Sequence, residues 1–244
     1  MGVANINTKH VTIAENVLKL YDEGIKQMWE DIFFGDRNAN DMYVRTFYKA
    51  RLSERIFKPP HTIAPSNASN LFRYAIAEGE PIDAVAFEEK YGFPMFDFSN
   101  CTQVDEAFRC NAFSRLGVID LRKISGANYT YFLFAQTDWS ENDRNLKSIE
   151  KIIVSETTPF YSTFFWCTEL VHCIFEGTIA KNGLTFAQCY KLSYESLISV
   201  IDCLKDYSED TSGTTWKVTF GTTNLNKLTA EDKQRIEVKG WTYA

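Results

Sequence analysis

Two short groups of carboxylates and lysines are the first places where this sequence could carry out chemistry. A metal-dependent nuclease of the restriction type holds its metal with carboxylates and places a lysine beside them, often as Glu-x-Lys on a neighbouring strand. Asp83 precedes Glu88-Glu89-Lys90, but the spacing is too short for two strands. Glu237-Val238-Lys239 matches the pattern in isolation, near the end of the chain. A magnesium-dependent nuclease is therefore one alternative, without a complete catalytic motif.

A third carboxylate, Asp120, also lacks the partners that a nuclease needs. Glu and Lys would be expected on the following strand, where this sequence has Phe134 and Gln136. A phosphate-binding glycine loop and the motifs of serine hydrolases and kinases are not found in the sequence. No cofactor is predicted.

Zinc is the other metal to consider, because Cys167, His172 and Cys173 lie close in the sequence. Structural zinc sites use Cys and His ligands at short, regular spacing. Separations of five and six residues on a helix place these side chains on different sides. They are therefore predicted to be core residues.

Basic residues offer a different chemistry, which is contact with nucleic-acid phosphates. Residues 42–58 predict a helix that carries several cations against the single carboxylate of Glu54, and it is the most basic element of the chain. Its candidate DNA-contacting residues are Arg45, Lys49, Arg51 and Arg55. The net charge of −6 argues against nonspecific coating of nucleic acid, which needs many Lys and Arg. It leaves room for a local basic face.

The elements that would position such residues centre on residues 81–135. Pro81 suits the first turn of a helix that Gly92 ends. Apolar residues at helical spacing predict a second helix over 102–116, closed by Gly117. Strands are expected at 118–121 and 129–135, joined by a turn at 125–128.

A helix, a loop, a second helix and a hairpin in this order resemble a winged-helix domain, through the FSRLGVIDL step and the ISGANYTYFLF wing. In winged-helix proteins the second helix usually enters the major groove and the wing contacts the backbone. The resemblance implies that four residues face bases: Gln103, Glu106, Arg109 and Ser114. It implies that four others meet phosphates: Arg122, Lys123, Ser125 and Asn128.

The remaining patterns predict a mainly α fold with small β-hairpins, in which amphipathic helices flank the winged-helix module. The expected divisions are a helical region over 1–80, the module over 81–138 and a helical region over 139–244. Further elements are expected as helices at 13–34, 71–77, 159–176, 184–205 and 229–239, a strand at 216–220, and a helix or strand at 146–155. No internal repeat is recognised in the sequence.

Composition limits where such a protein works. The chain has 244 residues, of which 45% are hydrophobic, but no run of eighteen apolar residues that would predict a membrane span. Its beginning lacks the apolar segment of a signal peptide. Six scattered cysteines are typical of a reduced, cytoplasmic protein without disulfides.

These observations favour a DNA-binding protein, such as the recognition component of a restriction, defence or other DNA-processing system, with double-stranded DNA as its partner. The alternative is an interaction scaffold whose winged helix assembles with a protein partner or as a homodimer. A basic face shared by the cationic residues would favour the first hypothesis, and scattered cations would favour the second.

Overall fold

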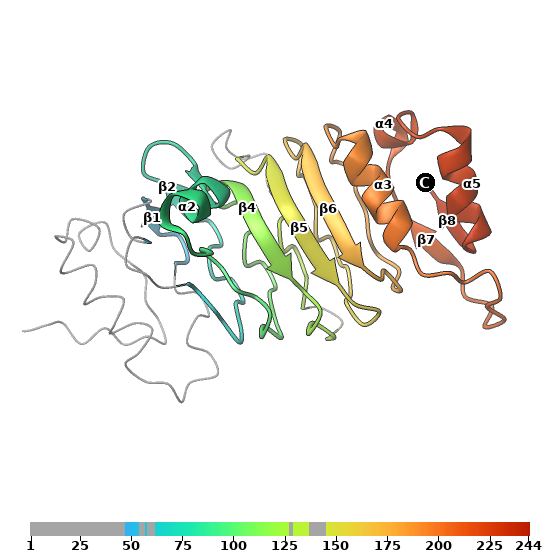
Figure 1. Cartoon of the computed structure of the whole chain (residues 1–244), viewed down its shortest axis with the longest axis horizontal. Helices are drawn as coiled ribbons and strands as arrows, with labels where there is room; N and C mark the ends of the chain where they lie inside the picture. The colour runs from blue at the N-terminus through green and yellow to red at the C-terminus, as the bar shows by residue number, and fades with distance from the viewer. Residues whose placement is uncertain (1–46, 54–56, 58–61, 127–128, 137–144) are drawn as a thin grey trace, which may run out of the picture.

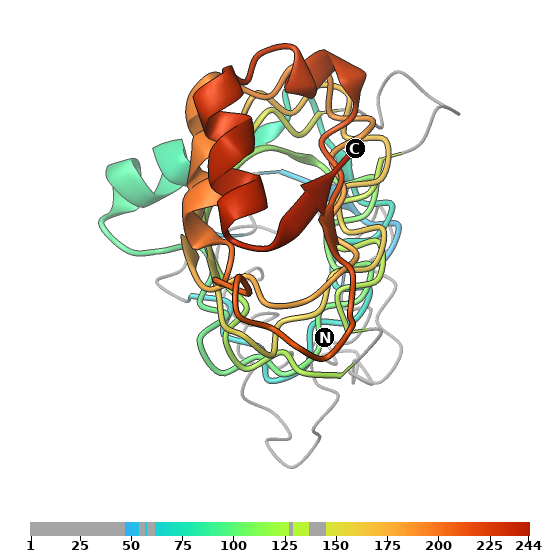
Figure 2. The ribbon, with the colours of Figure 1, turned by 90° about the vertical axis from the view of Figure 1, so that its right-hand side faces the viewer.

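Successive coils of the chain stack along one axis, as the computed structural model shows (Figure 1). The structure describes residues 47–53, 57, 62–126, 129–136 and 145–244. Viewed from the C-terminal end, the coils lie one behind another around a shared interior (Figure 2). The architecture is therefore that of a parallel β-solenoid, in which each coil contacts mainly its neighbours.

Each coil contributes a strand to a sheet on one side of the stack. The main sheet has the order β3-β4-β5-β6, and its members are β3 (Ile82–Asp83), β4 (Phe113–Asp120), β5 (Ser148–Val154) and β6 (His172–Gly177). Two further pairs are β1 (Arg51–Leu52) with β2 (Ile76–Ala77), and β7 (Trp216–Val218) with β8 (Trp241–Tyr243). All these pairings are parallel, because each coil returns to the same side in the same direction.

A ladder of phenylalanines fills the interior from one coil to the next. Its members are Phe47, Phe72, Phe108, Phe134, Phe164, Phe186 and Phe220. Successive ring centroids lie 4.9–6.4 Å apart, within the range that aromatic pairs favour. All seven side chains are buried. The ladder is therefore the central column of the hydrophobic core.

Left-handed turns flank the ladder in most coils. Residues with positive φ lie two positions before or two positions after a ladder phenylalanine. Those before it are Asn70, Glu106, Phe132 and Ser162, and those after it are Lys49, Tyr74, Cys110 and Trp166. Such φ values are uncommon outside glycine, so their recurrence marks a repeated backbone form. We call the four segments 68–74, 104–110, 130–136 and 160–166 the turn face.

Backbone hydrogen bonds tie the turn face together from coil to coil. Phe72 N–H donates to the Ala107 carbonyl at 2.8 Å, and Phe108 N–H donates to that of Leu133 at 2.9 Å. Phe134 N–H continues the series to the Thr163 carbonyl at 2.9 Å. The turn face is therefore as regularly bonded as a sheet, although it consists of turns.

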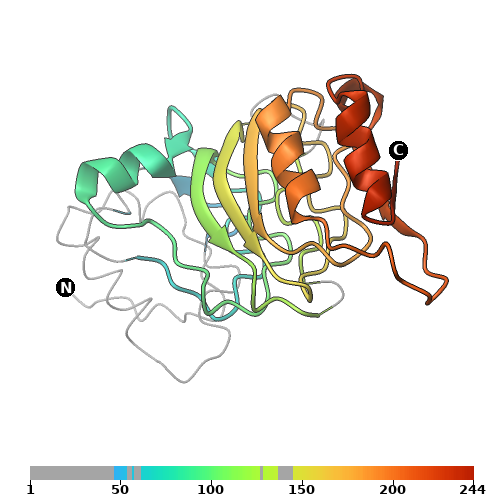
Figure 3. The same cartoon turned by 45° about the vertical axis from the view of Figure 1, so that its right-hand side comes forward.

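In the described part of the chain, four short helices interrupt the coils. They are α2 (Ala84–Tyr91), α3 (Tyr194–Cys203), α4 (Thr222–Leu225) and α5 (Ala230–Val238). Helix α3 lies beside β6, in the place that the next strand would take (Figure 3). Ser196 Oγ accepts a hydrogen bond from the backbone N–H of Cys173, and Ser199 Oγ accepts one from that of Phe175. The helix thus covers the edge of the sheet, which would otherwise expose free N–H groups.

The predicted mainly α winged-helix fold is wrong. Residues 102–116 form part of the turn face and the start of β4, where a recognition helix was expected. The segment expected as the second wing strand also lies on the turn face. Gly117 lies inside β4 and does not end a helix. A Cβ at this position would come within 2.8 Å of the Glu88 carboxylate.

Several other helix predictions also fail. The described part of 42–58 holds a turn and β1, and 71–77 holds a turn and β2. Residues 159–176 form turns and β6, and 184–205 is helical only in α3. The predicted helix over 13–34 lies outside the described residues.

Two predictions that rest on local end signals are confirmed, whereas Pro81 precedes β3 and does not begin α2. Helix α2 ends at Gly92, which has a left-handed conformation. Helix α5 begins at a capping box formed by Thr229 and Asp232. Strands β5 and β7 lie where strands were allowed or expected. All six cysteines are buried and outside disulfides. No helix among the described residues is both long and apolar enough to cross a membrane.

Candidate functional site

The four residues predicted to read bases do not share a helix. Glu106 and Arg109 lie on the turn face, Gln103 lies just before its segment 104–110, and Ser114 lies in β4. Gln103 Nε2 donates to Asp105 at 2.7 Å. Ser114 Oγ donates to a backbone carbonyl at 3.3 Å. The helical arrangement that would have aimed these side chains into a DNA groove is absent from this segment.

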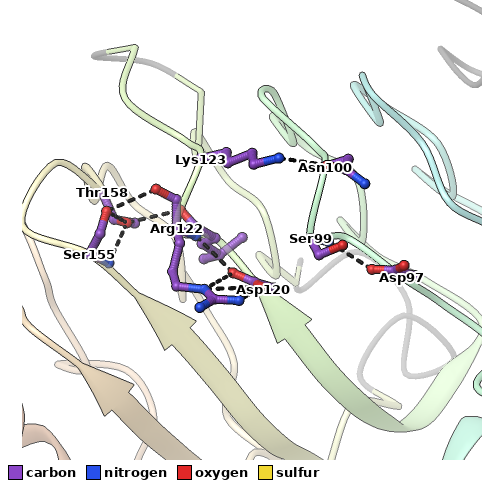
Figure 4. A network of polar contacts seen from close by, with 9 residues as sticks. Asp97, Ser99, Asn100, Asp120, Arg122, Lys123, Ser155 and Thr158 are labelled. Atoms are coloured by element: carbon purple, nitrogen blue, oxygen red, sulfur yellow. Dashed lines mark hydrogen bonds and ion pairs between the residues drawn. The ribbon is translucent and has the colours of Figure 1, made fainter.

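The two predicted phosphate-binding cations lie at the end of β4, in a local polar network (Figure 4). Arg122 Nη2 and Nε both donate to Asp120, at 2.6 and 3.1 Å to Oδ2. Burial alone would raise the pKa of Asp120, but the hydrogen bonds from Arg122 lower it below its usual value. Lys123 Nζ donates to Asn100 Oδ1 at 2.5 Å. Ser125 is exposed nearby.

The same network closes the corner after β4. Ser155 Oγ donates to the Arg122 carbonyl at 2.9 Å, and Thr158 Oγ1 donates to the Leu121 carbonyl at the same distance (Figure 4). Side chains and backbone of two successive coils are thereby joined. These contacts stabilise the corner, and the Arg122 guanidinium is paired with the Asp120 carboxylate.

The described cations that were predicted to contact DNA lie in separate places. Lys49 and Arg109 lie on or next to the turn face, Arg51 lies in β1, and Arg122 and Lys123 lie after β4. Eight residues of β4 separate Arg109 from the second group, a span of roughly 26 Å. Arg45, Arg55 and Asn128 lie outside the described residues. The cations that are described do not form one basic face.

Two arginines on the turn face share one buried carboxylate. Arg73 and Arg109 each pair through Nη1 with Glu106, which is 7% exposed. The Arg73 guanidinium lies 4.9 Å from the ring centroid of Tyr74, and that of Arg109 lies 4.8 Å from the ring of Phe132. Burial lowers the pKa of Arg109, but the hydrogen bond to Glu106 and the electrostatic interactions with Tyr74 and Glu106 together outweigh it, so the pKa is raised. Both cations are therefore held by groups of their own chain.

A cavity opens on the turn face beside this cluster. Its volume is about 370 Å³, and it is lined by Gln103, Asp105, Tyr129, Tyr131 and Tyr161. The rings of Tyr131 and Tyr161 lie 5.2 Å apart. Tyr129 is 40% exposed and Tyr161 is 53% exposed. The cavity therefore has aromatic walls that face solvent and a polar wall made of one amide and one carboxylate.

Further aromatic side chains continue from the cavity along the turn face. We call Tyr129, Tyr131, Phe132, Tyr161, Phe165 and Trp166 the aromatic row. Phe132 and Phe165 lie 5.5 Å apart on neighbouring coils, and Phe165 is 40% exposed. The sequence predictions missed this row, because the dense aromatics of 159–176 were interpreted as a buried helix. The adjacent pair Phe164 and Phe165 divides between the core and the surface.

The carboxylates considered for nuclease chemistry lie in separate places. Asp83 caps α2 and pairs with Arg115 at 3.2 Å. Glu237 lies on α5, and Lys239 Nζ donates to three carbonyl groups at the end of α3. Nowhere in the described part of the chain do three or more potential ligands gather as they would around a metal ion. The arrangement therefore lends no support to metal-dependent cleavage.

Among the described carboxylates, Glu88 on α2 has a raised pKa. Its partial burial is the main cause, the hydrogen bond from the Met95 N–H at 3.2 Å opposes it, and nearby Glu150 adds to it. The folded protein therefore favours the protonated form, and ionisation costs stability as the pH rises above the ordinary value of a glutamate.

We expect Glu88→Gln to raise the melting temperature at pH 7, because glutamine keeps the acceptor for Met95 without a charge. The gain in melting temperature should shrink toward zero at pH ~3.5, where Glu88 is mostly protonated in both the folded and the unfolded protein. Thermal melts at the two pH values measure it, with the exposed neighbour Glu89→Gln as the control. A gain of equal size at both pH values would contradict this explanation.

No family model, curated protein or solved structure gives a significant match to this chain. The cavity and the aromatic row are therefore interpreted from their own geometry.

Proposed function

We propose that this chain is a non-catalytic binding scaffold and that the turn face holds its ligand. The observation that carries this proposal is the aromatic row, in which Tyr129, Tyr161 and Phe165 stay exposed on coils whose backbones are hydrogen-bonded to each other. Exposed apolar groups gathered in one place are typical of binding surfaces. Stacked coils commonly present such groups along an extended surface.

The backbone of the turn face supports this proposal. Glu106 N–H donates to the Tyr131 carbonyl at 2.8 Å, and Phe132 N–H donates to the Tyr161 carbonyl at 3.2 Å. These bonds fix the spacing of the rings before any ligand arrives. A preorganised surface loses less conformational freedom on binding, and more of the contact energy therefore appears as affinity.

DNA binding through a winged helix is not retained, because the recognition helix is replaced by the turn face and β4. The paired states of Arg109 and Arg122 also favour the scaffold hypothesis, since phosphate contacts need cations that can leave their partners. A nucleic-acid ligand is one outcome that the following test detects.

The test compares three forms of the full chain on arrays of glycans, peptides, and single- and double-stranded nucleic acids. One form is unchanged, and the second carries Tyr161→Ala and Phe165→Ala. The third carries Val118→Ala and Val238→Ala, which remove exposed apolar side chains elsewhere. We expect at least one ligand class to bind the unchanged and control forms and to lose about tenfold or more in affinity with the turn-face variant.

Two results would contradict the proposal. One is binding that the turn-face substitutions leave unchanged or that both variants lose equally. The other is no binding to any class on the arrays.

A further inference from the structure

We propose that the cavity between Tyr129, Tyr131 and Tyr161 binds one sugar residue of a neutral glycan chain. This inference rests on the proposed function, because it names the ligand of the turn face. A volume of about 370 Å³ lies at the lower end of the range for small-ligand pockets. Such a cavity has room for a single sugar ring, and its open mouth allows a chain to continue in both directions.

The aromatic walls fit the apolar face of a sugar. A pyranose ring presents C–H groups on its faces and hydroxyl groups around its edge. Tyr131 and Tyr161 come from neighbouring coils, and their rings are tilted by 35° from each other. They form a shallow apolar wall, against which the C–H face can pack while the hydroxyl edge turns toward the polar wall.

The polar wall is held in place by neighbouring side chains. Asp105 Oδ1 accepts from Ser69 Oγ at 2.5 Å and from Gln103 Nε2 at 2.7 Å. Gln103 Oε1 in turn accepts from Asn67 Nδ2 at 3.3 Å. Among the described residues, the Ser69 and Gln103 side chains both donate to Oδ1 of Asp105 and not to its Oδ2. Its Oδ2 can therefore accept from a sugar hydroxyl, and the second N–H of the Gln103 amide can donate to another.

The charge of the cavity selects against anionic ligands. Its five lining residues include one carboxylate and no cation. Phosphates and acidic sugars would be repelled by Asp105, whereas a neutral hydroxyl gains a charge-assisted hydrogen bond. Two cations on the turn face beside the cavity, Arg73 and Arg109, are paired with Glu106. The cavity therefore favours a neutral glycan over a nucleic acid.

An extended peptide is a poorer fit for this surface. Peptides that add a strand need a row of free backbone N–H and C=O groups. Around the cavity, the N–H groups of Val104 and Glu106 already donate to the carbonyls of Tyr129 and Tyr131. A glycan needs only side-chain contacts, and its neighbouring sugar units can lie on Phe132 and Phe165.

The test measures binding of labelled full-length chain to a glycan array, followed by titration calorimetry with the neutral oligosaccharides that bind. Tyr161→Ala removes an exposed wall, and Asp105→Asn removes the charge while it keeps the shape. We expect each to weaken binding about tenfold or more. The matched controls are Tyr190→Ala and Asp97→Asn, which change an exposed tyrosine and an exposed aspartate outside the cavity. They should bind as the unchanged chain does, and thermal melts should show all four variants folded.

Binding of neutral glycans that Tyr161→Ala or Asp105→Asn leaves unchanged would overturn the inference, as would no glycan binding at millimolar concentration. Binding to peptides or nucleic acids that depends on Tyr161 would overturn the sugar assignment and leave the turn face as the binding surface. Glycan binding that ignores every turn-face substitution would overturn both proposals.

Discussion

Replacing Phe134 with alanine should lower the free energy of unfolding by about 3–5 kcal/mol. Phe134 lies in the middle of the phenylalanine ladder and is fully buried. Its ring stacks between Phe108 at 6.0 Å and Phe164 at 5.4 Å. The backbone on both sides is bonded to neighbouring coils, so the coils cannot close around the space left by the ring. The substitution should therefore leave a cavity that does not collapse, and its cost should lie near the upper end of this range.

Urea melts followed by circular dichroism measure this effect, with Phe165→Ala as the matched control. Phe165 is 40% exposed, and its ring lies beside those of Phe132 and Trp166 in the row. Its loss should cost clearly less than the loss of Phe134, because much of its surface already contacts water and no closed cavity is left in the core. Equal losses at the two positions would mean that the ladder is not the core of the stack.

The winged-helix prediction failed because a turn can imitate helical spacing. Val104, Ala107 and Phe108 lie three and four residues apart, as on one face of a helix. All three are buried, but they point inward because left-handed turns at Glu106 and Cys110 reverse the chain. Glycine usually marks such turns, and neither residue is glycine. The sequence therefore holds no local signal that separates this turn from a helix.

The repeat escaped recognition because its period varies. Successive ladder phenylalanines are 22 to 36 residues apart, since the coils carry insertions such as α2. Repeats are usually found through a fixed period. A weaker signal exists, because a small or aliphatic residue precedes each of these phenylalanines, as in Ala107-Phe108, Leu133-Phe134 and Thr163-Phe164. An alignment on these pairs predicts where each coil passes through the core.

Local signals predicted what local interactions decide. The capping box before α5 and the glycine after α2 fix helix ends with few residues, so both were correct. The candidate site depends on contacts between coils, which the sequence does not show. The sequence predicts Gln103 to read bases, yet it lines the tyrosine cavity because the next two coils bring Tyr129 and Tyr161 to it.

Replacing Ser196 and Ser199 of α3 with alanine should destabilise the end of the main sheet. Ser196 is buried, and its hydroxyl is the partner of the Cys173 N–H at 2.9 Å. Loss of this partner should cost about 1–3 kcal/mol, because the N–H stays buried without an acceptor. Ser199 is half-buried, and the Phe175 N–H that it binds at 3.1 Å should lose less. The two losses should sum in the double variant, and urea melts measure the resulting decrease in the free energy of unfolding.

Hydrogen exchange separates this mechanism from a general loss of helix stability. The amide hydrogens of Cys173 and Phe175 should exchange faster in the double variant than those of Ile149 and Ile152, which lie inside the sheet on β5. Ser199→Thr keeps a hydroxyl group and should preserve the protection at Phe175. Weaker attachment of α3 should let the helix leave β6 more often and expose the edge of the sheet to other chains, so the double variant should also aggregate sooner. Unchanged exchange at both amides would mean that α3 covers β6 by packing alone and that its serines are not what closes the sheet.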